Sequence, residues 1–222
     1  MDITGVPIPQ ELHPRKNPRQ SRAQATVDAI LEATAHILAK RGYDGMTTNH
    51  VAERAGVSIG SLYQYYPSKE SLVAALLQKN AEDNLRTLQQ AIDRAAGLPL
   101  VQALEVLIDD FLELHATNPQ HHAVLIDGAP QIGILEWERT STKDNLGVLA
   151  DFLSTYSDEF RPGLDLPLAL TVLAAMTRSI FDRLVVHDPA GLKSDAIRRE
   201  ILMVIIVYLT GRAPGPRSDA AD

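Results

Sequence analysis

The sequence has no cysteine and no long hydrophobic run, and each absence excludes a class of protein. With no cysteine among 222 residues, the chain cannot form disulfides, thiolate zinc sites, iron–sulfur clusters or a cysteine nucleophile. The longest strongly apolar stretch, Ile201–Leu209, falls far short of the ~18–20 residues that span a membrane. The N-terminus also lacks the basic-then-apolar order of a signal peptide. We therefore expect a soluble, cytoplasmic protein without a membrane partner.

The net charge of −7 argues against a protein that coats nucleic acid over its whole surface. The charge is uneven, however. Residues 1–80 contain 9 Lys and Arg against 7 Asp and Glu, whereas residues 81–222 contain 12 against 21. Four basic residues, Arg15, Lys16, Arg19 and Arg22, fall within eight positions of the N-terminal part. Such a stretch is typical either of an arm that reaches DNA or of a solvated tail.

Apolar residues recur at spacings of three and four along most of the chain, which predicts an all-α fold of about nine helices. The first helix is predicted from Arg22 to Arg41, where two basic residues precede the stop at Gly42. Further helices are expected over residues 69–96, around 104–117 and over 121–127, 133–156, 167–186 and 194–210. No stretch alternates with the period of two that marks a strand.

Residues Thr47–Tyr66 have the pattern of a helix-turn-helix. Two short helices that cross steeply need a small residue where they approach, which Ala52 supplies, and a glycine in the turn, which Gly56 supplies. Thr47 or Thr48 is placed to cap the first helix, and Ser58 the second. The apolar contacts then fall on Val51, Ala55, Val57, Leu62 and Tyr65.

In this geometry the second helix places its N-terminal side chains in the DNA major groove. Those side chains are Ser58, Ile59, Gly60, Ser61, Gln64 and Tyr65, and Tyr63 and Lys69 are expected to face phosphates. A packed helical corner without DNA is the alternative. The basic flank upstream and Lys69 downstream favour DNA binding.

Residues Val57–Leu72, read as VSIGSLYQYYPSKESL, closely resemble the signature of the TetR family of transcriptional regulators, and the match covers about Val27–Leu76. The resemblance implies a three-helix DNA-binding domain followed by a helical ligand-binding and dimerisation domain. It also implies a homodimeric repressor that a small ligand releases from DNA. It assigns DNA contacts to the positions that match Thr47, Thr48, Ser58, Gly60, Ser61, Tyr63, Tyr65 and Lys69.

Two positions depart from that family pattern. Ile59 is apolar where a polar or basic residue is frequent, so contact with a thymine methyl is expected there. Tyr66 stands where phenylalanine is commoner and is expected in the core. The predicted organisation is a flexible basic arm (1–21), a DNA-binding domain (22–68), a ligand-binding and dimerisation domain (69–212) and a flexible tail (213–222).

The last two predicted helices are apolar almost all round, which favours packing on a partner subunit as well as on their own core. A deeply buried helix of a monomer is the alternative. A dimer would space two recognition helices about one DNA turn (~34 Å) apart, so the expected partner is an inverted-repeat operator in double-stranded DNA. The candidate interface residues are Val172, Met176, Ile201, Ile205 and Tyr208.

Candidates for an effector pocket are weaker, because they follow only from the helices that enclose the pocket in similar proteins. They are Phe111, His115, His122, Trp137, Phe152, Arg178 and Asp182. Trp137, the only tryptophan, fits a core or surface-anchoring position as well as a pocket. His115, His121 and His122 match no strong zinc spacing, so no metal or cofactor is predicted.

Two other classes of protein fit the sequence less well. An all-helical enzyme is disfavoured, because the sequence has no HExxH, Gly-rich phosphate loop or GxSxG motif. An architectural DNA-binding protein without a sensor is disfavoured by the acidic, apolar C-terminal part, since such binding needs broad positive charge. The sequence does not identify the effector, the operator or the regulated genes.

Overall fold

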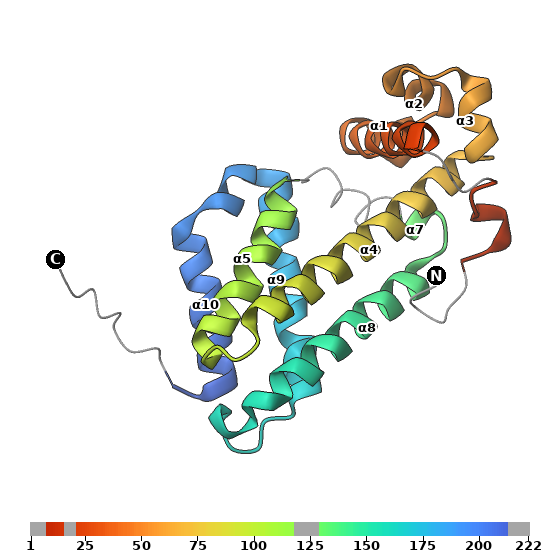
Figure 1. Ribbon diagram of the computed structural model, residues 1–222. Coiled ribbons are helices and arrows are strands. Elements are labelled where there is room, and N and C mark those ends of the chain that lie inside the picture. Colours follow the sequence, from red (N-terminus) through yellow and green to blue (C-terminus); the bar gives the residue numbers. More distant parts are fainter. Residues whose placement is uncertain (1–7, 16–20, 118–128, 213–222) are drawn as a thin grey trace. The chain divides into compact units, whose positions relative to one another are not determined.

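The computed structural model describes residues 8–15, 21–117 and 129–212, and every regular element within these ranges is helical (Figure 1). The chain divides into two compact units. Unit 1 consists of Met1–Leu85 and Thr117–Asp144, and unit 2 consists of Arg86–Ala116 and Asn145–Asp222. No helix in the described ranges is long and apolar enough to cross a membrane. The all-helical expectation is confirmed, whereas the predicted domain boundaries stay a prediction.

Unit 1 packs a short 3₁₀ helix and three helices against the first part of a long one. In chain order these are η1 (Gln10–Leu12), α1 (Ser21–Gly45), α2 (Thr48–Ala55), α3 (Ile59–Tyr65) and α4 (Lys69–Ala95). The short α7 (Ala129–Gln131) and the first part of α8 (Leu135–Leu153) complete it. Its core includes the fully buried Ile30, Val51, Leu62, Leu72 and Leu76.

The first helix ends where the sequence predicts. Gly42 adopts φ 66° and ψ 176° and interrupts the helical backbone of α1, a conformation that only glycine adopts without strain. Ser68 precedes α4, and its hydroxyl accepts a hydrogen bond from the Ser71 backbone N–H at 3.2 Å. Both ends of the segment around the helix-turn-helix are therefore fixed by local backbone chemistry.

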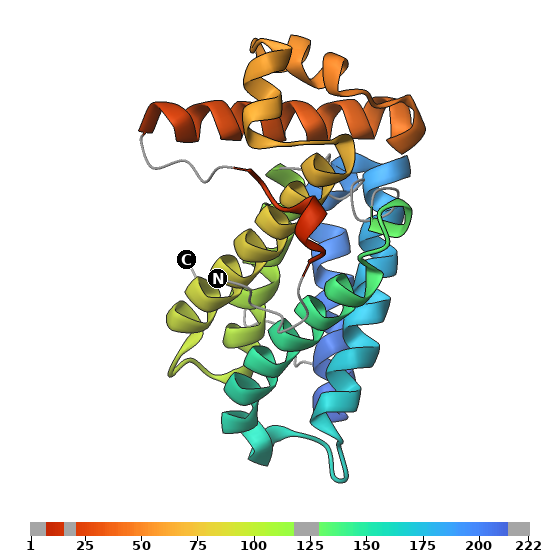
Figure 2. The same cartoon turned by 90° about the vertical axis from the view of Figure 1, so that its right-hand side faces the viewer.

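The regular elements of unit 2 are all helices (Figure 2), and their buried apolar side chains form a second core. It contains the rest of α4 and α8 together with α5 (Leu100–Thr117), η3 (Ser154–Glu159), α9 (Leu166–His187), η4 (Pro189–Lys193) and α10 (Asp195–Thr210). Leu104, Phe181, Ile201 and Leu209 are among its buried residues. An ion pair between Arg198 and Asp109 joins α10 to α5.

Element boundaries agree with the sequence best where a capping residue marks them. Ser194 caps α10 by accepting from Ile197 N–H, and α9 begins at Leu166 behind its capping Asp165. The helix predicted over 133–156 is wrong at both ends. Gly133 adopts φ 73°, so α8 starts only at Leu135, and the backbone tightens into η3 from Ser154. The segment predicted at 121–127 lies outside the described residues.

Candidate functional site

The turn between α2 and α3 is built by the residues that the sequence predicts. Thr47 caps α2, where its hydroxyl accepts from the His50 N–H at 3.2 Å. Gly56 ends α2 in the left-handed conformation, φ 67° and ψ 27°. Ser58 then caps α3 and accepts from the Ser61 N–H at 3.0 Å. The backbone conformation of the turn thus follows directly from residue type.

Apolar contacts hold the two helices together. Val51 and Leu62 are fully buried, and Ala52, where the helices approach, is 3% exposed. Ala55, Val57 and Tyr65 pack against the same core from half-buried positions. Tyr66 is also buried, as expected, and its burial raises the pKa of its phenol above the ordinary value, with a further rise from Asp28. The helix-turn-helix packing is therefore confirmed.

The side chains predicted to meet DNA lie mostly at the surface of this unit. Ile59 and Tyr63 are 38% and 40% exposed. Thr47, Ser58, Gly60 and Gln64 are also exposed, whereas Thr48, Ser61 and Tyr65 are half-buried. The Tyr63 hydroxyl lies 3.0 Å from the Thr48 hydroxyl oxygen, so the start of α2 and the middle of α3 are hydrogen-bonded to each other. Small polar groups and two exposed apolar ones thus form one face.

Lys69, expected at phosphate, is engaged within unit 1. Its amino group donates to the Tyr43 carbonyl oxygen at 3.3 Å and lies 4.1 Å from the centre of the Tyr43 ring. The Tyr43 hydroxyl in turn donates to Glu70 at 2.9 Å. Burial and then the Glu70 carboxylate raise the pKa of Tyr43 above its ordinary value. These contacts join the end of α1 to the start of α4.

One cation near α2 is not identified as a site residue by its sequence pattern. The sequence identifies Arg41 only as part of a helix-stop signal. In the structure its guanidinium donates a hydrogen bond to His50 Nε2 at 2.9 Å. This contact places positive charge beside the first helix of the helix-turn-helix, near Thr47. Its signal in the sequence is a basic residue nine positions before a histidine, which is not distinctive. Of the basic flank, Arg15 is described, whereas Lys16, Arg19 and the side chain of Arg22 lie outside the described residues.

The residues predicted for an effector pocket do not form one group. Phe111, His115 and Phe181 form a cluster of tilted and edge-to-face ring contacts in unit 2, with ring centres 4.2 to 5.1 Å apart. Phe152 packs instead against Tyr156, and Arg178 lies 4.0 Å from Asp182. Trp137 is buried in the core of unit 1. His121 and His122 lie outside the described residues, within which no three acidic or histidine side chains are placed to hold a metal.

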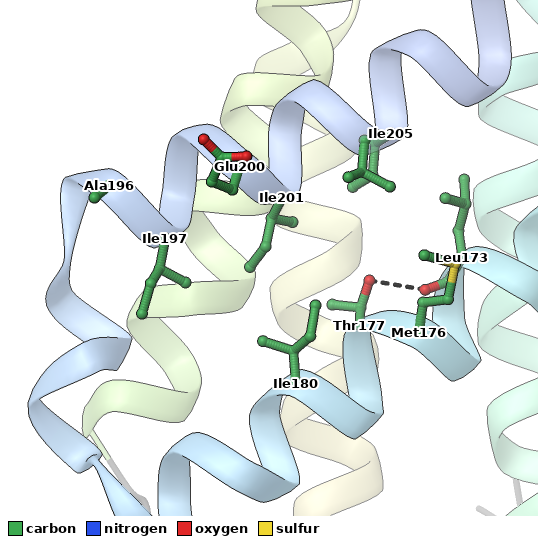
Figure 3. A pocket seen from close by; sticks show the side chains of 10 residues that line it. Leu173, Met176, Thr177, Ile180, Ala196, Ile197, Glu200, Ile201 and Ile205 are labelled. Carbon is green, nitrogen blue, oxygen red and sulfur yellow. Dashed lines mark hydrogen bonds between the residues drawn. The ribbon is translucent and has the colours of Figure 1, made fainter.

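A groove of about 330 Å³ lies between α9 and α10 (Figure 3). Leu173, Met176, Thr177 and Ile180 face it from α9, and Ile197, Ile201 and Ile205 face it from α10. The lining is apolar except for Thr177, whose hydroxyl donates to the Leu173 carbonyl oxygen at 2.8 Å, and Glu200. None of the effector-pocket candidates that the structure describes lines this groove.

The predicted interface residues divide by exposure. Met176 is 44% exposed and Val172 and Tyr208 are half-buried, but Ile201 and Ile205 are buried in the core of unit 2. Other apolar side chains on the same two helices are more exposed, although the helical pattern does not single them out. We call the exposed set the apolar face; it comprises Leu168, Met176 and Ile180 on α9 and Met203, Val204 and Val207 on α10.

Two family models match the chain. The model described as "Bacterial regulatory proteins, tetR family" matches residues 30–76, which contain the helix-turn-helix. The model described as "Tetracyclin repressor-like, C-terminal domain" matches residues 99–209, which is half of the chain.

Individual proteins show the same likeness. The chain is 42% identical over 93 residues to the HTH-type transcriptional repressor KstR of Mycolicibacterium smegmatis, covering 40% of this chain and 43% of that protein. It is 26% identical over 191 residues to KstR2 of the same species, covering 82% of this chain and 90% of that protein. The solved structure of the ketosteroid transcriptional regulator KstR2 of Mycobacterium tuberculosis superposes with a TM-score of 0.65 at 20% identity, covering 87% of this chain and 97% of that one.

Proposed function

This chain belongs to the TetR family of bacterial regulatory proteins, and we propose that it binds an inverted-repeat operator as a homodimer and leaves it when a small molecule binds. Family membership makes it a DNA-binding transcriptional repressor with a helix-turn-helix, not an enzyme. Its place of action is then the cytoplasm, where bacterial DNA lies.

The observation that carries the DNA contact is the exposed face of α2 and α3. In a helix-turn-helix the start of the second helix meets base edges, and neighbouring groups meet phosphates. We assign base contacts to Ser58, Ile59, Gly60, Ser61, Gln64 and Tyr65, and phosphate contacts to Thr47, Thr48, Tyr63 and Lys69. An exposed Ile59 in this position suits a thymine methyl group. For Lys69 to reach phosphate, its amino group must leave the Tyr43 carbonyl.

The apolar face supports the homodimer. Six large apolar side chains on α9 and α10 are between 39% and 59% exposed, and exposed apolar side chains gathered on two neighbouring helices are typical of an interaction surface. A second copy of the same helices would cover it symmetrically, as two-fold dimers require. Val172, Met176, Ile201, Ile205 and Tyr208 lie on these helices and would take part directly or by supporting the face.

Release requires an effector that binds one conformation better than the other. We assign the effector to the domain over residues 69–212, with Phe111 and His115, whose ring centres lie 4.2 Å apart in unit 2, as the first candidate contacts. Helix α4 runs from Lys69, next to the helix-turn-helix, into unit 2, so a ligand that shifts it would shift the DNA-binding face. Because one similar structure is that of a ketosteroid transcriptional regulator, ketosteroids are the first effectors to test.

The operator proposal is tested by selecting DNA from a random pool and footprinting the selected site. We expect symmetric protection of an inverted repeat and two chains per site, with a preference over random DNA on the order of 10³ or more. Protection of one half-site by a single chain would contradict the homodimer. A preference lost in competition with random DNA would favour the architectural alternative.

The release proposal is tested on the same DNA. Titration with candidate effectors should weaken operator binding at least about fivefold for the true ligand. Native mass measurement of the purified protein would find a co-purifying ligand directly. Equal operator affinity with and without a saturating ligand would refute release, but it would leave DNA binding intact.

A further inference from the structure

Residues 8–15, which we call the docked segment, are packed onto unit 1 although the sequence predicts a flexible arm there. Ile8 and Leu12 are 4% and 8% exposed and belong to the same core as Val51 and Leu62. The segment is also folded on itself. The Leu12 N–H donates to the Pro9 carbonyl oxygen at 2.9 Å, and His13 Nε2 donates to the Ile8 carbonyl oxygen at 2.9 Å.

The docked segment ends against the recognition helix. The Arg15 backbone N–H donates to the Tyr65 carbonyl oxygen at 2.8 Å, and the Arg15 guanidinium donates to the Tyr63 carbonyl oxygen at 3.4 Å. Both acceptors belong to the last turn of α3, whose carbonyl groups have no partner further along the helix. The last turn of α3 contains no basic residue of its own, so Arg15 supplies the cation that suits the negative end of a helix dipole.

The Arg15 side chain remains available to a further partner. It is exposed, and within the described ranges no carboxylate pairs with it. It bonds the backbone of Tyr63, the residue whose hydroxyl meets Thr48. A guanidinium has five N–H donors, and the single long bond to Tyr63 uses only one of them.

We propose that the docked segment is a fixed part of the DNA-binding surface and that Arg15 contacts a DNA backbone phosphate. The proposal rests on operator binding by α2 and α3. Phosphate is favoured over base edges because Arg15 is held at the C-terminal end of α3, whereas the N-terminal side chains of a recognition helix meet the bases. Guanidinium geometry also suits the two oxygens of a phosphate. Anchoring by Ile8 and Leu12 means that little entropy is lost when the contact forms.

The test is the salt dependence of operator binding by the full chain and its Arg15→Gln variant. Each phosphate neutralised contributes about 0.9 to the slope of log K against log salt. With one Arg15 in each subunit of a dimer, the variant should lower the slope by about two and weaken binding on the order of tenfold at low salt. Base preference should be unchanged, because phosphate contacts carry no sequence information.

Two further variants distinguish a phosphate contact of Arg15 from a purely structural role in stabilising the end of α3. Arg212→Gln removes an exposed arginine after the end of α10 and should change neither the slope nor the affinity. Leu12→Ala should loosen the docked segment, and combined with Arg15→Gln it should weaken DNA binding by less than the product of the two single effects. Circular dichroism establishes that each variant is folded.

An Arg15→Gln variant with the parent's slope and affinity but a lower melting temperature would overturn the proposal, because Arg15 would then only cap α3. A parent chain that binds no DNA would instead overturn the operator proposal itself. The two failures are therefore distinguishable in one set of titrations.

Discussion

At the scale of single residues, glycines show where chemistry fixes the backbone. Gly56 has φ +67°, and a Cβ added there would meet nothing within 4 Å. The requirement is thus for backbone conformation and not for space. Gly147 lies inside α8, where an added Cβ would also meet open space, but its φ is not positive. The two glycines are a matched pair that separates the two effects.

We expect Gly56→Ala to destabilise the protein by about 1–2 kcal/mol, because an L-residue in the left-handed region costs about that much. Gly147→Ala should stabilise it by about 0.5–1 kcal/mol, because alanine is the better helix former. Thermal or urea unfolding of both variants measures the difference. Equal shifts of the same sign would contradict the assigned conformation of Gly56.

At this scale the sequence predicts what depends on residue type and nearest neighbours. The caps at Thr47 and Ser58 and the turn at Gly56 are of this kind. It does not predict the contact of Lys69 with Tyr43 or of Arg15 with Tyr63, because those partners lie 26 and 48 positions apart in the chain. Long basic side chains have many rotamers, and only the packed structure selects one.

At the scale of elements, the contact that joins α1 to α4 contains an ionisable side chain, Glu70. The Glu70 carboxylate accepts from the Tyr43 hydroxyl. Burial acts to raise the pKa of Glu70, but hydrogen bonds from its own backbone N–H, from Ser68 and from Tyr43, with Lys69 nearby, outweigh it. Its pKa therefore lies below the ordinary 4.5. The joint is thus stabilised by the ionised form of this side chain.

The consequence is a pH dependence with a defined sign. A carboxyl with a lowered folded-state pKa contributes stability that is fully present above its ordinary pKa and is lost as the pH falls through the folded-state value. Glu70→Gln should therefore be less stable than the parent near pH 7, and this difference should narrow as the pH falls below the ordinary pKa of 4.5. Melting temperatures across this range measure it. Glu32→Gln, at an exposed position on α1, is the control, and an equal gap at every pH would contradict the assignment.

Element boundaries follow the same division between local and distant causes. The ends of α1, α9 and α10 are marked by glycine or by capping Asp and Ser, so the sequence predicts them closely. The sequence does not predict the ends of the elements between residues 133 and 159 as closely, because the apolar periodicity continues across Gly133 and Ser154. Gly133 does offer the glycine signal, but the apolar residues on both sides of it continue the helical pattern, and the change to 3₁₀ geometry from Ser154 has no comparable signal.

At the scale of the whole molecule, the apolar face is the feature that a single chain leaves uncovered. Helical pattern alone selects the predicted interface residues, and it does not distinguish the inner from the outer side of a helix that is apolar all round. Ile201 and Ile205 are buried in the core of unit 2, while Val204 and Val207 are exposed, so the part of each residue in an interface stays a prediction. The effector contacts are harder still, since pocket shape depends on packing that no local pattern encodes.

A matched pair of valines tests the dimer. Val207 on α10 and Val101 on α5 are each 39% exposed. Val207→Lys should lower the dimer association constant on the order of a hundredfold, because two ammonium groups would be buried without partners. Val101→Lys should leave the dimer unchanged. Analytical ultracentrifugation gives the association constants. A Val207→Lys chain that stays dimeric like the Val101→Lys control would contradict the proposed interface.

The burial of Trp137 makes its fluorescence a specific probe of the unfolding of unit 1. It is the only tryptophan in the chain, it is 4% exposed, and it lies in the core of unit 1. Selectively excited indole emission is therefore a signal from unit 1 alone, while far-ultraviolet dichroism records the helices of both units. If the two signals change at different denaturant concentrations, the two units melt separately, and each substitution above can be assigned to the unit whose stability it alters.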